Sequence, residues 1–223
     1  MFIVDTAYDS VVYRDEAMKN VLNFFRHNLH PEDHFGFISL DGPRQALKDE
    51  IRLERCESNK NLKIKVMENI SGREIDYVFN REGGNSAKMI RLERALEKAY
   101  NWQNTLVQNF ETTVNDKIYI GPHKWIVCIL GDDVYSVNQF RLNNRDRLVG
   151  QSNMSISIMT MTADVKDKKL HSKDYHELTE LTRKGLFVSV VEKKSIDEVT
   201  KRFLSSMDVF KSSKSPCIKE FFS

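Results

Sequence analysis

FIVDTAYDSVVYRDEAMKNVLNFFRHNL, residues 2–29, contains a strand-like run, a polar loop and a helix-like pattern in immediate succession. The apolar run at 2–4 is typical of a strand that is covered on both faces. The polar stretch DTAYDS follows at 5–10, and apolar residues then recur at helical spacing from Ala17 to Leu29. A strand that leads through a short loop into a helix is the repeating unit of α/β proteins, so this segment favours that fold class.

Strand-like and helix-like patterns alternate along the rest of the chain. The expected strands lie at 35–40, 51–55, 62–66, 125–130, 154–161 and 186–191. The expected helices lie at 70–80, from about 86 to as far as Phe110, at 140–149, 175–185 and 195–207. We predict an α/β fold with a doubly wound, mostly parallel central sheet, one antiparallel edge strand and helices on both faces.

Charge and composition exclude several classes of protein. The chain has 223 residues, with 34 Lys and Arg against 32 Asp and Glu, so nothing in its charge calls for a nucleic-acid or membrane partner. Three cysteines are few, and an odd number cannot all pair, so a disulfide framework is not indicated. This cysteine usage favours a cytoplasmic, intracellular location. No secretory signal precedes the first strand, and no apolar run approaches the ~20 residues that a membrane helix needs.

Three polar loops lie at or near strand ends or helix starts. They are DTAYDS at 5–10, GGNS at 83–86 and GDD at 131–133. In open parallel sheets, ligands bind outside the carboxyl ends of the strands, near the point where the strand order reverses. We therefore expect the three loops to converge on one surface.

The segments FIVDTAYDS, EGGNSAKMIRLERALEKA and KWIVCILGDD resemble, in this order, the loops of the metal-ion-dependent adhesion site of von Willebrand factor A domains. That family carries D-x-S-x-S after its first strand, a Thr in a Gly-Gly-Thr-like loop, and an Asp in a Thr-Asp-Gly loop. HPEDHFGFISL and HELTELTRKGLFVSVVEKKSIDEVTKRF resemble other parts of the same fold. The resemblance implies a Rossmann-like domain over 1–207, followed by a C-terminal tail at 208–223.

The first two loops depart from the metal-binding pattern of that family. Asp5 stands at the first ligand position, but Ala7 replaces the first serine and Asp9 the second. Asn85 falls on the threonine position. Because Mg²⁺ prefers near-octahedral oxygen ligation and Ala7 supplies no oxygen, we expect a degenerate site without tightly bound metal or another cofactor.

The third loop is ambiguous, because Gly131 falls on the family's aspartate position unless a one-residue shift places Asp132 there. If a metal were bound, its ligands would be Asp5, Asp9, Asn85 and Asp132. The ordinary alternative for Asp5 and Asp9 is a helix cap or a turn, in which the carboxylate accepts from backbone N–H groups.

We expect a non-catalytic, intracellular protein–protein interaction module that belongs to a larger protein or assembly. The partner-binding residues would be Asp5, Tyr8, Asp9, Ser10, Asn85, Ser86, Asp132 and Asp133. Their acidic rim would favour a basic partner segment. The oligomeric state and the identity of the partner stay open.

Other functions remain possible from the sequence alone. One alternative keeps a working Mg²⁺-dependent ligand-binding site, in which Ser10 would join the ligands named above. Another is a small α/β hydrolase or phosphotransferase that uses Asp5, although no G-x-S-x-G, Walker or G-x-G-x-x-G motif is present. The last alternative is a purely structural block in a larger complex.

Overall fold

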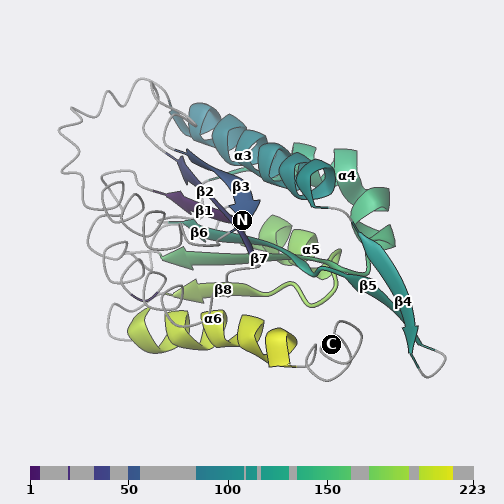
Figure 1. Ribbon diagram of the computed structural model, residues 1–223. Helices are drawn as coiled ribbons and strands as arrows, with labels where there is room; N and C mark the ends of the chain where they lie inside the picture. The colour runs from purple at the N-terminus through teal and green to yellow at the C-terminus, as the bar shows by residue number, and fades with distance from the viewer. Residues whose placement is uncertain are drawn as a thin grey trace.

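The computed structural model places twelve elements in an open sheet flanked by helices, with a separate hairpin (Figure 1). It describes residues 1–5, 20, 33–40, 50–55, 84–107, 109–114, 117–130, 135–161, 171–190 and 196–212. The expected helix at 17–29, apart from Asn20, and the expected elements at 62–66 and 70–80 lie outside these residues.

The central sheet has six strands in the order β3-β2-β1-β6-β7-β8. Their bounds are β1 Phe2–Asp5, β2 His34–Leu40, β3 Glu50–Arg55, β6 Lys124–Leu130, β7 Met154–Met161 and β8 Phe187–Val190. Five strands, β2, β1, β6, β7 and β8, pair in parallel, and β3 pairs antiparallel with β2. The predicted α/β fold with a parallel sheet is confirmed.

The strand order reverses between β1 and β6. From β1 the chain moves through β2 to β3 at one edge of the sheet. It then crosses to β6 on the other side of β1 and moves outward through β7 to β8. The carboxyl end of β1 therefore lies at the topological switch point, where open α/β sheets bind their ligands.

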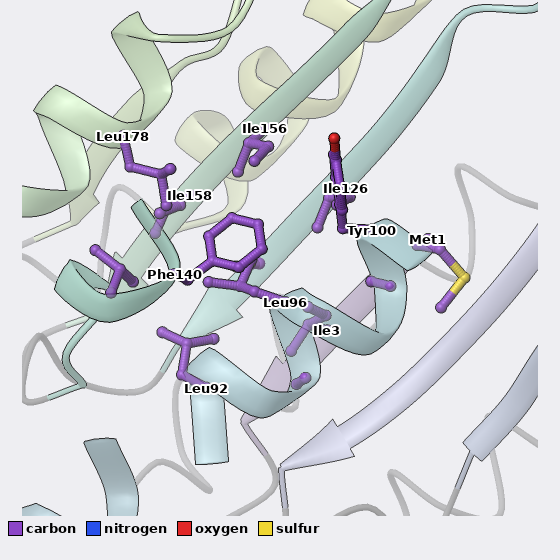
Figure 2. Close-up of a cluster of buried hydrophobic side chains, with 14 of the residues drawn as sticks. Met1, Ile3, Leu92, Leu96, Tyr100, Ile126, Phe140, Ile156, Ile158 and Leu178 are labelled. Carbon is purple, nitrogen blue, oxygen red and sulfur yellow. The ribbon is translucent and has the colours of Figure 1, made fainter. Parts of the chain in front are cut away.

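One face of the sheet is covered by α3 (Gly84–Leu106), α4 (Asn138–Gly150) and α5 (Ser172–Glu180). Their apolar side chains form one core with alternate residues of the strands (Figure 2). Labelled members of this core include Ile3, Leu96, Ile126, Phe140 and Leu178. Burial of one such side chain contributes about 1.5–3 kcal/mol, so this shared core holds the helices on the sheet.

The last helix, α6 (Ile196–Ser212), contacts a β7 side chain on the other face of the sheet, because successive residues of a strand point to opposite faces. Thr200 on α6 donates to the sulfur of Met159 at 3.7 Å, whereas Ile156 and Ile158 belong to the core under α5. The helix continues five residues past 207, where the sequence predicted the domain to end.

A two-stranded hairpin, β4 (Phe110–Val114) and β5 (Lys117–Gly121), separates α3 from β6. The prediction that the long helix reaches as far as Phe110 is wrong, because α3 ends at Leu106. The hairpin sequence is rich in β-branched residues, which favour strands. Asn153 holds both ends of the hairpin, since its Nδ2 donates to Asn109 Oδ1 at 3.1 Å and to the Pro122 carbonyl at 3.0 Å.

The predicted helix at 175–185 is also corrected, because α5 ends at Glu180. The left-handed residue after it is Lys184, with φ 64°, rather than Gly185. A Cβ at Gly185 would lie 2.2 Å from the Thr179 carbonyl oxygen and 2.5 Å from that of Ile156. The glycine is therefore required by the close approach of two backbone segments.

Within the described ranges, no helix combines the length and the apolar character needed to cross a membrane.

Candidate functional site

The candidate site is centred on Asp5, the last residue of β1. Register pairing places Asp5 opposite Leu40 of β2, and the preceding Val4 opposite Ile129 of β6. The Asp5 side chain is therefore at the switch point, and the residue is only 2% exposed. A carboxylate this deeply buried requires a hydrogen-bond donor or a cation.

Tyr135 supplies a donor to that carboxylate. Its hydroxyl donates a short hydrogen bond to Asp5 Oδ2, across 130 positions of sequence. Tyr135 is itself buried and follows the loop at 131–134 that comes after β6. A phenol thus engages the carboxylate that the family resemblance assigns to metal binding.

Tyr175 on α5 fixes the backbone of Tyr135. The Tyr175 hydroxyl accepts from the Tyr135 N–H at 3.1 Å and donates to the Tyr135 carbonyl at 2.7 Å. Both buried backbone groups of this non-helical residue are therefore satisfied by one side chain. The chain of contacts from Asp5 through Tyr135 to Tyr175 connects β1, the end of the 131–134 loop and α5.

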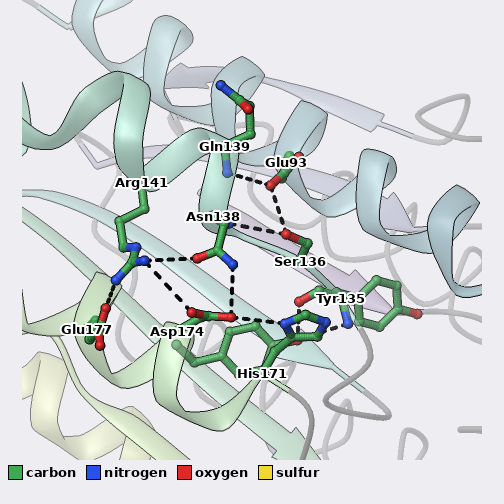
Figure 3. A network of polar contacts seen from close by, with 10 residues as sticks. Glu93, Tyr135, Ser136, Asn138, Gln139, Arg141, His171, Asp174 and Glu177 are labelled. Carbon is green, nitrogen blue, oxygen red and sulfur yellow. Dashed lines mark hydrogen bonds and ion pairs between the residues drawn. The ribbon is translucent and has the colours of Figure 1, made fainter.

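Glu93 on α3 caps the start of α4 (Figure 3). Val137 at the N-cap position makes no side-chain cap. Instead, Glu93 Oε1 accepts from the Gln139 N–H at 2.8 Å and from the Ser136 hydroxyl at 3.1 Å. A carboxylate at a helix N-terminus satisfies an otherwise unpaired N–H and interacts favourably with the helix dipole.

Asp174 in the first turn of α5 completes this network (Figure 3). Its Oδ2 accepts from Asn138 Nδ2 at 3.1 Å and lies 3.0 Å from His171 Nδ1. Arg141 bonds to Asn138 Oδ1 at 3.0 Å and forms an ion pair with Glu177. Polar contacts therefore join the starts of α4 and α5 to each other, and join the start of α4 to Glu93 in α3.

The structure describes only part of the other predicted site residues. Asn85 and Ser86 lie in the first turn of α3, which begins at Gly84. Tyr8, Asp9, Ser10, Asp132 and Asp133 lie outside the described residues. Of the predicted set, Asp5 alone has a described side chain. Among the described residues, no group of three or more His, Cys, Asp or Glu side chains is arranged to hold a metal ion.

Sequence reasoning missed Tyr135 and Tyr175 as members of the site. A usable signal existed for Tyr175, which precedes the buried Leu178 by three residues and so belongs to the apolar face of its helix. A tyrosine on a buried helix face needs a partner for its hydroxyl. Only the folded structure shows that this partner is the backbone of Tyr135.

Two further titratable groups lie in β6. Lys124 is 4% exposed, and its Nζ donates to Asn104 Oδ1 at 3.2 Å, an oxygen that also accepts from Gln151. Burial lowers the pKa of the Lys124 ammonium. Burial also raises the pKa of the Cys128 thiol far above its ordinary value, so this cysteine is a structural apolar residue rather than a nucleophile.

Comparisons with protein-family models, with curated proteins and with solved structures found no match for the chain.

Proposed function

We propose that this chain is a non-catalytic protein–protein interaction module of the von Willebrand factor A type. It works inside the cell, within a larger protein or assembly, and binds its partner without a tightly held metal ion. The strand order, the antiparallel pairing of β3 with β2, and helices on both faces support this doubly wound arrangement.

The single observation that carries the metal-free part of the proposal is the hydrogen bond from Tyr135 to Asp5. A divalent ion at this position would have to compete with the phenol for the Asp5 carboxylate. A hydrogen bond to a charged group contributes about 1.5–3 kcal/mol, and an ion would have to offset that loss. Ala7 has no hydroxyl to act as a ligand, which further weakens the binding of a competing ion.

The partner would contact the loops that follow β1 and β6 and precede α3. Tyr8, Asp9, Ser10, Asp132 and Asp133 are the contact residues in the first and third loops, and Asn85 and Ser86 those at the start of α3. Three aspartates against no basic residue in this set favour a basic partner segment, chiefly through faster association. No catalytic role is assigned to Asp5, because its carboxylate is buried and already engaged.

The test is capture of a partner on the immobilised chain, in Mg²⁺ and in EDTA, with quantification by mass spectrometry. We expect equal recovery of the same protein in both conditions, and a loss of recovery in the double variant Asp9→Lys, Asp132→Lys. The control is Glu180→Lys, an exposed acidic residue at the far end of α5. Recovery that depends on Mg²⁺ would favour the working metal site, and recovery unaffected by the double variant would exclude the loop surface.

A further inference from the structure

We draw no further inference here: the strongest candidate, the outer side of α4 that carries the exposed Leu142 and Val149, supports none, because nothing in the structure shows what covers it.

Discussion

At the residue scale, the stability of the fold depends on hydrogen bonds to its buried polar groups. Asp5 and Tyr135 are both 2% exposed, and the Tyr135 hydroxyl donates to the Asp5 carboxylate. An isolated buried carboxylate is costly, and an unpaired buried hydroxyl also costs free energy. Their hydrogen bond offsets part of both penalties.

Removal of the Tyr135 hydroxyl should therefore destabilise the fold. We expect Tyr135→Phe to lower the free energy of unfolding by about 1.5–3 kcal/mol, the range for hydrogen bonds to charged groups. Tyr100→Phe is the matched control, because it removes a hydroxyl from another buried tyrosine of the same core that does not bond to Asp5, and it should lower the free energy of unfolding by less than Tyr135→Phe does. Urea denaturation measures both, and a Tyr135→Phe variant as stable as the wild type would refute the role of this contact.

Lys124 leads to a prediction about pH. Its folded-state pKa lies below the ordinary value of 10.5, so between these two values the unfolded chain binds more protons than the folded chain. Stability from this residue therefore rises with pH through that window, and the full cost of the buried charge is present below it. We expect Lys124→Met to be at least as stable as the wild type at neutral pH, with an advantage that shrinks as pH approaches 10.5.

Chemical denaturation of both proteins across this alkaline range checks the prediction for Lys124. A constant difference in unfolding free energy at all pH values, or a difference that grows with pH, would show that burial does not penalise the Lys124 charge.

The limit of sequence reasoning at this scale is visible in the same residues. Asp5 was identified because a carboxylate at the end of a strand is a local pattern. Tyr135 was not, because its partner lies 130 positions away and no local pattern encodes that contact. Lys124 precedes the apolar run WIVCIL and gave no sign that it would be buried.

At the scale of elements, the start of α4 is capped from two sources. The local Ser136 hydroxyl accepts from the Asn138 N–H at 3.3 Å, and α3 supplies a second acceptor. Glu93 supplies the acceptor for the Gln139 N–H and the Ser136 hydroxyl. The start of α4 therefore depends on the packing of a second helix, in addition to its own sequence.

Glu93→Ala should lower the free energy of unfolding by about 0.5–2 kcal/mol, the cost of losing a helix N-cap. Glu111→Ala, which removes an exposed glutamate from β4, is the control and should change stability by less than about 0.5 kcal/mol. Thermal unfolding of both variants tests this prediction. Equal stability of Glu93→Ala and Glu111→Ala would mean that the cap contributes nothing.

Elements with a uniform pattern were predicted well, and boundaries between patterns were not. The strand at 154–161 has the predicted bounds, and β6 begins one residue earlier than expected. The end of α3 was missed because Leu106, Val107 and Phe110 continue the helical spacing of apolar residues beyond the helix. Periodicity alone does not distinguish the end of a helix from the first residues of the next strand.

At the scale of the whole molecule, the alternation of strands and helices predicted the α/β fold class. The position of the switch point is a property of the strand order, which places β1 between β2 and β6. That order puts Asp5 where ligands bind in such sheets. Beside it, Asp174 joins α5 to α4, and Glu93 joins α3 to α4. We propose that the Tyr135 phenol occupies this position in place of a tightly held ion.

The most direct test of this claim is a Mg²⁺ titration of the wild-type chain, followed by thermal unfolding at constant ionic strength. We predict a melting temperature that stays the same at every Mg²⁺ concentration, because the Asp5 carboxylate is already satisfied by Tyr135. A saturable, Mg²⁺-specific rise in melting temperature that disappears in Asp5→Ala would contradict the account.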